Sequence, residues 1–297
     1  SLTHHIRYHT DIHAGDLCFG AREIGYMFGQ YKKLTNDFTG AFTGKKPNRG
    51  GSLLRTEATG YGVAYFAQEM LRHKGDSLEG KTCIISGAGN VGIYTMEKLT
   101  QLGAKVVGLM DYDGSIYDEH GIDEERLAYL KDLVFVRRGS LKDYDKKFPG
   151  AHFRPGKKTW DIPCDYAFPT ACENELDGQD AQLLINNGCK GVCEGSNMPC
   201  TPEAIECIKA AKLLYSPGKA SNAGGVEVYC LEMTQNSMRV YWTREEVEKY
   251  LQRIMNSIHQ NCLEAAAMYG MPGDYMAGAN IFGFKKVADA MIDQGLV

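Results

Sequence analysis

Short apolar runs alternate with helical patterns through the middle of the chain, and this alternation constrains the fold more than any other feature. The runs have strand character at five places, near residues 82–86, 105–110, 165–168, 191–194 and 213–216. The helical patterns among them fall near residues 91–102, 123–136, 175–187 and 202–212. Short apolar strands that alternate with helices are typical of a parallel sheet covered on both faces. The sequence therefore predicts an α/β fold with a doubly wound (Rossmann-like), mostly parallel sheet.

Further helical patterns occur where no strand is expected. They lie near residues 22–35, 57–73, 243–269 and 278–293. Thr243 and Glu246 have the spacing of a capping box, in which each side chain binds the other residue's backbone N–H. This pair predicts the start of a long helix. We expect the doubly wound domain at about 52–225, and we expect the helical segments on either side of it to form part of a second, incomplete domain.

The charge balance excludes some classes of partner. The chain has 297 residues, with 33 Lys and Arg against 37 Asp and Glu and a formal net charge of −4. Surfaces that bind nucleic acids or anionic membranes need a basic excess, so neither partner is expected. No apolar run approaches the roughly 20 residues that span a bilayer, and no signal peptide opens the chain. Because the first residue is serine, we expect the chain to begin at an engineered or cleavage boundary.

Cysteine and histidine spacing gives little support for disulfides or metal. None of the ten cysteines forms a CxxC pair, and most lie in apolar stretches. We interpret them as reduced, buried thiols of a cytoplasmic protein. His5, His9 and His13 are spaced by four, so on a helix they would share a face and could bind zinc. We favour a frayed segment instead, because a fourth ligand is missing, and we predict no metal site.

The sharpest local motif is a glycine-rich turn between a predicted strand and a predicted helix. Gly87, Gly89 and Gly92 form the GxGxxG pattern of dinucleotide-binding folds. The first glycine permits the tight turn, the second lets the backbone approach a pyrophosphate, and the third allows close packing of helix on sheet. Asp111 follows Gly92 by 19 residues and ends the next predicted strand, where an acid binds the adenosine ribose. The acid favours NAD over NADP. The alternative is a glycine-rich turn without a ligand.

Seven sequence blocks, in order along the chain, resemble the hexameric glutamate dehydrogenases. They are AGD at 14–16, GAREIGYMFGQYKKLT at 20–35, GGSLLRTEATGYG at 50–62, SGAGNVG at 86–92, EGSNMP at 194–199, KASNAGGV at 219–226 and EMTQNS at 232–237. The resemblance covers the C-terminal two-thirds of that family, without the N-terminal segment that carries the catalytic lysine. It implies that residues 1–51 are a remnant of a substrate and oligomerisation domain. It also implies a dinucleotide-binding domain at 52–225 and C-terminal helices at 226–297 that return to the first domain.

The resemblance also implies an activity and a set of site residues. The activity is NAD- or NADP-dependent oxidative deamination of glutamate to 2-oxoglutarate and ammonium, in a homo-oligomer that is a hexamer at full length. Asp16 matches the carboxylate that carries the proton of the amine. The residues matching substrate contacts are Gly15, Arg55, Asn222 and Tyr229. The residues matching cofactor contacts are Thr59, Gly87, Gly89, Asn90, Val91, Asp111, Ala171 and Asn197.

Some of these positions have plainer interpretations. Without the resemblance, Asp16 would be a turn or capping residue, and Arg55 could form an ordinary surface salt bridge. Tyr229 stands where the family places a serine that reaches the substrate's distal carboxylate. The loop with Cys18 and Phe19 is bulkier than usual. These departures predict a remodelled or closed substrate pocket.

Three functions follow from this pattern. The first is a glutamate dehydrogenase fragment, which we expect to be inactive because the catalytic-lysine segment is missing from the given chain. The second is a catalytically silent nucleotide-binding or assembly protein derived from such an enzyme. The third is a dehydrogenase for another amino acid, which the bulk of Tyr229 favours.

Overall fold

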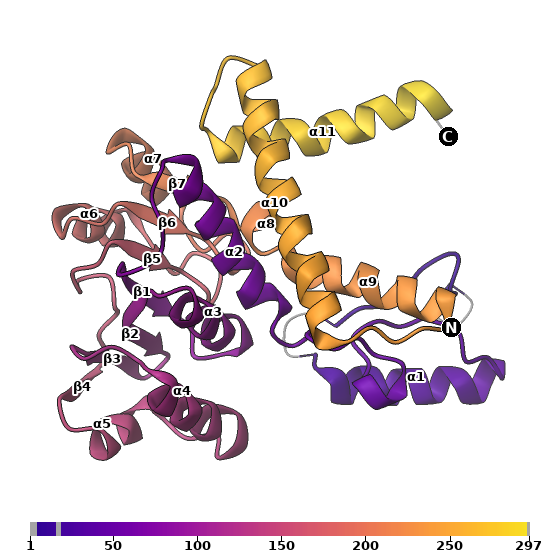
Figure 1. The fold of residues 1–297 in the computed structure, drawn as a ribbon, viewed down its shortest axis with the longest axis horizontal. Helices are drawn as coiled ribbons and strands as arrows, with labels where there is room; N and C mark the ends of the chain where they lie inside the picture. The colour runs from indigo at the N-terminus through magenta and orange to yellow at the C-terminus, as the bar shows by residue number, and fades with distance from the viewer. Residues whose placement is uncertain (1–4, 16–18, 296–297) are drawn as a thin grey trace. The chain divides into compact units, whose positions relative to one another are not determined.

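The computed structural model describes residues 5–15 and 19–295, which fall into two compact units (Figure 1). The N-terminal unit comprises residues 1–58 and 224–254, and the sheet unit comprises residues 59–223 and 255–297. The domain division expected from the sequence differs from this grouping, because residues 255–297 join the sheet unit rather than the N-terminal unit. The functions assigned to the three expected pieces stay predictions.

One sheet of seven strands forms the centre of the sheet unit. The strands are β1 (Thr82–Ser86), β2 (Lys105–Asp111), β3 (Gly114–Asp118), β4 (Ala151–Pro155), β5 (Tyr166–Phe168), β6 (Gly191–Cys193) and β7 (Leu214–Ser216). Their spatial order is β4-β3-β2-β1-β5-β6-β7, which can be followed in Figure 1. The four pairs β1–β2, β1–β5, β5–β6 and β6–β7 are parallel, whereas β2–β3 and β3–β4 are antiparallel. The predicted doubly wound, mostly parallel sheet is confirmed.

The sequence did not predict the two antiparallel strands. β3 follows β2 after a tight turn, with Asp111 opposite Gly114, and β4 pairs with β3 along its whole length. Neither strand is a continuous apolar run: β3 reads GSIYD and β4 reads AHFRP, and β4 is only partly buried. Antiparallel strands at a sheet edge need no fully apolar sequence, so this extension gives a weak signal.

Helices cover both faces of the sheet. The helices of this unit include α2 (Ala58–His73), α3 (Asn90–Gln101), α4 (Glu124–Lys131), α5 (Tyr144–Lys147), α6 (Gly178–Asn186), α7 (Pro202–Ala210), α8 (Gly218–Ser221) and α11 (Tyr275–Gln294). Val192 packs in one apolar cluster with Leu184 of α6 and Ile208 of α7. The next residue, Cys193, points to the other face, where its sulfur lies 3.8 Å from the carbonyl oxygen of Val63 in α2. Successive side chains of β6 therefore contact helices on opposite faces of the sheet.

The N-terminal unit is helical. It contains α1 (Ala21–Thr35), α9 (Gly224–Met238) and the first part of α10 (Arg244–Met268), with a short 3₁₀ turn at Pro47–Arg49. Ile24, Phe28 and Tyr31 of α1 pack against Ala41 and Phe42. This unit therefore has an apolar cluster of its own.

Two local expectations for this unit have clear outcomes. The capping box before α10 is confirmed, because the Thr243 N–H lies 2.7 Å from Glu246 Oε2 and the Glu246 N–H lies 3.2 Å from Thr243 Oγ1. Residues 5–13 are not helical: a bridge joins Arg7 to Asp11 and another joins His13 to Phe42. The three histidines therefore do not share a helical face.

Most of the described cysteines are buried free thiols. Cys83, Cys164, Cys189, Cys193, Cys200 and Cys262 are buried, whereas Cys172 and Cys230 are exposed, so the expectation of burial was wrong for those two. Cys18 lies outside the described residues. Burial raises the pKa of Cys193 to about 12, so this thiol is protonated at neutral pH. Within residues 5–15 and 19–295, no helix combines the length and apolarity that crossing a membrane would require.

Helix α11 packs on α10 through a close backbone approach. A Cβ added at Gly278 would lie 2.0 Å from the carbonyl oxygen of Cys262. Nearby, His259 Nε2 and the Tyr275 hydroxyl are 2.9 Å apart and buried. Burial lowers the pKa of His259 to about 4, so the ring is neutral at physiological pH.

We expect Gly278→Ala to destabilise the protein, because its methyl group must displace the α10 backbone and such overpacking costs about 1–3 kcal/mol or more. Gly283→Ala on the same helix is the matched control, since a Cβ there meets nothing within 4 Å. Alanine should stabilise that exposed helical position by about 0.5–1 kcal/mol. Thermal unfolding followed by circular dichroism measures both. Equal melting temperatures for the two variants would contradict the close packing.

Candidate cofactor and substrate sites

The glycine-rich turn joins β1 to α3 and is open on one side only. Gly87 has a φ of +79°, and a Cβ there would lie 2.7 Å from the Ala171 Cα. A Cβ on Gly92 would lie 1.9 Å from the carbonyl oxygen of Gly87. A Cβ on Gly89, by contrast, would meet nothing within 4 Å. Two glycines are thus required by packing, and the third leaves an exposed backbone face.

The start of α3 lies directly behind this open face. Gly89 is the N-cap residue, and no side chain caps the helix. The first N–H groups of a helix have no partner within it and carry a partial positive charge. Asn90 is exposed and Val91 is half-buried in this first turn. The arrangement fits the phosphates of a dinucleotide, because a negative group can approach Gly89 closely and meet free N–H donors.

The open face also lies at the point where the strand order reverses. From β1 the chain crosses through α3 to β2 on one side, and β5 pairs with β1 on the other. Ligands of open α/β sheets bind at the carboxyl ends of strands at such a switch point. Ala171 follows β5 at this edge, and its N–H lies 2.9 Å from Glu175 Oε1. Burial raises the pKa of the Glu175 carboxyl.

Two further cofactor candidates lie beside this edge. Thr59 lies in the first turn of α2, next to Gly60. A Cβ on Gly60 would lie 2.4 Å from the N atom of Thr95 in α3, so the starts of the two helices are close together. Asp111 ends β2 and is half-buried, with the Tyr112 N–H 2.9 Å from its Oδ1. Burial raises the pKa of Asp111, and the neighbouring Asp113 raises it further.

Asn197 and Asn222 meet at the carboxyl ends of β6 and β7. Asn197 is exposed in the loop after β6, and Asn222 is the C-cap residue of α8. Asn222 Nδ2 donates a hydrogen bond of 2.8 Å to Asn197 Oδ1. The sheet unit therefore contains all eight predicted cofactor residues together with Asn222, which had been assigned to the substrate. Their roles stay predictions.

The remaining described substrate candidates form a cluster in the N-terminal unit. The Tyr229 hydroxyl donates a hydrogen bond of 2.8 Å to the carbonyl oxygen of Gly15. The Arg55 guanidinium stacks on the Tyr229 ring, with its Cζ 3.7 Å from the ring centroid. Arg55 Nε is buried and has no hydrogen-bond partner among the described residues. The structure thus places Arg55 against an aromatic ring, and Asp16 lies outside the described residues.

Sequence reasoning missed a buried ion pair in this unit. Glu232 is 0% exposed, and its carboxylate lies 2.8 Å from Lys45 Nζ. The same carboxylate accepts hydrogen bonds from the N–H groups of Gly44 and Ser52, at 3.1 Å each. A Cβ on Gly44 would lie 3.0 Å from Tyr229 Cε1. The loop that is hydrogen-bonded to Glu232 therefore lies beside the tyrosine ring. In the sequence, the ion pair is indicated only by Glu232, the acid of the block EMTQNS, which stands among the apolar residues of α9.

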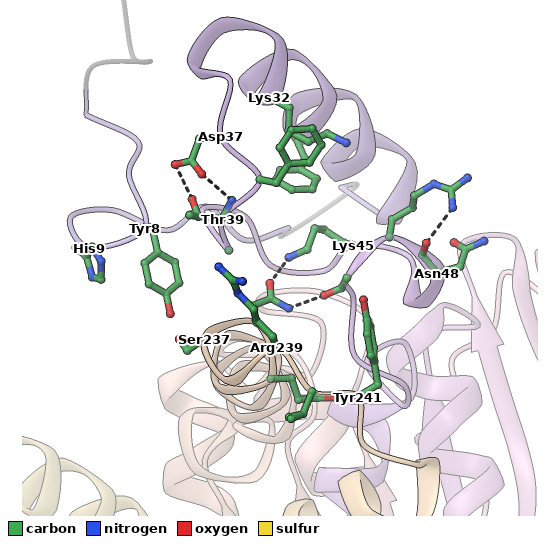
Figure 2. A pocket seen from close by; sticks show the side chains of 18 residues that line it. Tyr8, His9, Lys32, Asp37, Thr39, Lys45, Asn48, Ser237, Arg239 and Tyr241 are labelled. Carbon is green, nitrogen blue, oxygen red and sulfur yellow. Dashed lines mark hydrogen bonds between the residues drawn. The ribbon is translucent and has the colours of Figure 1, made fainter.

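A pocket of about 900 Å³ lies elsewhere in the N-terminal unit (Figure 2). Aromatic rings and cationic side chains line it, among them Tyr8, Phe28, Phe38, Tyr241, Lys32, Arg49 and Arg239. Among the described residues, its one acidic lining residue is Asp37, which accepts hydrogen bonds from Thr39 in its own turn. None of the predicted site residues that the structure describes lines this pocket.

Comparison with known proteins decides the family. The family described as Glutamate/Leucine/Phenylalanine/Valine dehydrogenase matches residues 50–295. The chain belongs to this family. The resemblance to glutamate dehydrogenases drawn from the seven sequence blocks is therefore confirmed.

Individual members of the family are similar over the whole chain. A protein of Bacteroides thetaiotaomicron named glutamate dehydrogenase is 52% identical over 300 residues, which is all of this chain and 66% of that protein. A protein of Xylanibacter ruminicola named NAD(P)-specific glutamate dehydrogenase is 52% identical over 290 residues, 96% of this chain and 64% of that protein. The chain thus spans slightly less than two-thirds of the length of these relatives.

A solved structure has the same fold. The glutamate dehydrogenase of Plasmodium falciparum superposes with a TM-score of 0.98 at 45% identity, over 100% of this chain and 64% of that one. This family member therefore shares the arrangement of elements described above.

We expect Gly89→Ala to leave folding unchanged and to weaken dinucleotide binding. The residue has a φ of −86°, which alanine adopts freely, and the added methyl group meets no protein atom. It would instead occupy the face that a pyrophosphate approaches, so we expect an affinity loss of about tenfold or more. Calorimetric titration with NAD⁺ and NADP⁺ measures this, and Gly25→Ala, another open glycine, is the control. Unchanged affinity would exclude the Gly89 face as the phosphate site.

Proposed function

We propose that the protein acts in the NAD- or NADP-dependent oxidative deamination of glutamate to 2-oxoglutarate and ammonium. The observation that carries this proposal is the open Gly89 face at the uncapped start of α3. It occurs in a chain 52% identical to a protein named glutamate dehydrogenase. Gly87, Gly92 and Ala171 support it, because their close packing gives the turn a shape in which only Gly89 is left open.

The sheet unit would hold the dinucleotide. Gly89, Asn90 and Val91 present backbone N–H groups to the pyrophosphate, and Asp111 accepts hydrogen bonds from the adenosine ribose. Thr59, Ala171 and Asn197 border the same edge and would orient the other half of the cofactor. When bound, the cofactor would supply an acceptor for the hydride of the substrate's Cα. Because Asp111 is acidic, we propose that NAD binds better than NADP.

The N-terminal unit would contribute to substrate binding. The resemblance assigns the amine's proton to Asp16, a carboxylate that can act as a general base. At Gly15 no side chain stands between the backbone and a substrate. Arg55 is a cation with an unpartnered Nε and can meet a substrate carboxylate. The resemblance also assigns Asn222 to the substrate.

We also propose that the 297 residues alone do not oxidise glutamate. The resemblance places the lysines that activate water and hold the substrate's α-carboxylate in a segment outside this chain. Catalytic groups that act together are strongly non-additive, so the loss of one set removes nearly all of the rate. The complete enzyme would form a homo-oligomer, a hexamer by the resemblance. It would act on small molecules in the cytoplasm without nucleic-acid or membrane partners.

Purified chain tests these proposals in two measurements. We expect calorimetric titration to show binding of NAD⁺ at millimolar concentration or below, and we expect no glutamate-dependent reduction of NAD⁺ or NADP⁺ at 340 nm. Absence of binding to either dinucleotide would refute the assigned cofactor site. Glutamate oxidation by the unmutated chain that is abolished in Asp16→Asn would refute the proposed inactivity.

A second candidate is a dehydrogenase for another amino acid, and the Tyr229 contacts favour it. The phenol hydroxyl already donates a hydrogen bond to Gly15, and the ring contacts Arg55 and lies close to Gly44. A serine there would leave more space and a free hydroxyl. We propose that Tyr229 shortens the pocket, so a smaller or less polar side chain than that of glutamate fits better.

Tyr229→Ser should then improve glutamate turnover in the intact protein, because the substrate carboxylate regains space and a matched donor. Tyr229→Phe is the control, since it keeps the ring and loses only the hydroxyl. Steady-state kinetics with glutamate and with shorter amino acids gives kcat/KM for each variant. If the unmutated protein uses glutamate efficiently and Tyr229→Ser lowers kcat/KM, the tyrosine is instead a productive substrate contact.

A further inference from the structure

Glu194 is a buried carboxylate at the carboxyl end of β6 and is only 3% exposed. Its Oε1 accepts a hydrogen bond of 2.8 Å from the Tyr215 hydroxyl and a longer one of 3.3 Å from the Cys200 N–H. Its Oε2 accepts a hydrogen bond of 2.7 Å from the Gly218 N–H. Burial and the adjacent carboxylate raise the pKa of Tyr215, which therefore stays a proton donor.

These donors come from two different segments. Cys200 lies in the loop after β6, whereas Tyr215 belongs to β7 and Gly218 begins α8. The two segments also approach each other closely, because a Cβ on Gly218 would lie 2.4 Å from the carbonyl oxygen of Ser196. The Ser221 hydroxyl donates to the main-chain oxygen of Glu194 from the end of α8. Glu194 is thus the acceptor at which both segments are joined.

Each segment carries one asparagine of the amide pair. Asn197 lies three residues after Glu194, and Asn222 caps the end of α8. Their hydrogen bond of 2.8 Å uses Nδ2 of Asn222 and Oδ1 of Asn197. This bond does not use the Nδ2 of Asn197 or the Oδ1 of Asn222. Their spacing depends on how the two segments are held together.

We propose that Glu194 is a positioning residue for the cofactor edge, which fixes the Asn197–Asn222 pair by joining the β6 loop to α8. The proposal rests on the proposed function, which places these asparagines beside the dinucleotide. Glu194 itself is buried and does not touch the ligand. It acts through the backbone N–H groups of Cys200 and Gly218, which have fixed directions and cannot turn into acceptors.

Glu194→Gln tests this at constant side-chain size. The amide has one acceptor oxygen in place of two, so at least one of the fixed N–H donors faces an NH₂ group. We expect the affinity for NADH to fall about 5- to 20-fold, as for other buried donors that lose an acceptor. In an Asn197→Ala/Asn222→Ala background, the same substitution should cause no further loss, because the groups through which it acts are gone.

Asp118→Asn is the matched control. Asp118 is a fully buried carboxylate on β3 of the same unit, and it accepts hydrogen bonds of 2.9 Å from both the Tyr144 hydroxyl and Arg126 Nε. We expect it to lower the melting temperature at least as much as Glu194→Gln and to leave NADH affinity within twofold of the unmutated chain. An equal loss of affinity in Asp118→Asn would reduce the role of Glu194 to general stability and overturn the proposal.

A second readout separates this proposal from cofactor binding. In ¹⁵N-labelled protein without ligand, the side-chain amide signals of Asn197 and Asn222 should shift in Glu194→Gln toward those of solvent-exposed asparagine, and they should stay unchanged in Asp118→Asn. If the unmutated chain binds no dinucleotide, the proposed cofactor site is wrong. The positioning role of Glu194 is then tested by these amide signals alone. Unchanged amide signals, unchanged NADH affinity, or an additive loss in the Asn197→Ala/Asn222→Ala background would each overturn the positioning role.

Discussion

Buried carboxylates that accept backbone N–H groups hold the loops of both units in place. Glu232 joins the loop of Gly44 and Ser52 to α9, and Glu194 joins the β6 loop to α8. Loops at a sheet edge or between helices have N–H groups without a regular partner, and a buried carboxylate satisfies several of them at once. The desolvation cost of Glu232 is offset in part by Lys45 at 2.8 Å. Glu232 holds the loop beside Tyr229, and Glu194 holds the two segments that carry Asn197 and Asn222.

Local signals in the sequence were enough to predict the parallel part of the sheet. β1 and the glycine-rich turn at Gly87–Gly92 lie where they were expected, because a buried strand, a tight turn and a helix start each require particular residues at adjacent positions. Helix α9 was not predicted. Its first turn contains Gly224, Gly225 and Val226, which have low helix propensity, and tertiary packing decides its conformation instead.

The contacts that shape the candidate sites join residues far apart in the chain. Glu232 and Lys45 are separated by 187 residues, and Tyr229 and Gly15 by 214. Periodicity and motif spacing report neighbours within a few turns, so neither contact has a signal in a single sequence. The family resemblance correctly directed attention to Tyr229. It gave no indication that the hydroxyl would bind Gly15 or that Arg55 would stack on the ring.

Neither unit is a continuous stretch of chain, and this has a consequence for biosynthesis. The N-terminal unit needs residues 224–254 to be complete, and the sheet unit needs residues 255–297. Helix α10 belongs to both, since the division falls inside it at Ile254. During translation the contacts that Gly44, Lys45 and Ser52 make with Glu232 can therefore form only after residues 59–223 have been synthesised. Because such delayed contacts slow folding and expose apolar surface, nascent chains should need chaperone protection at this stage.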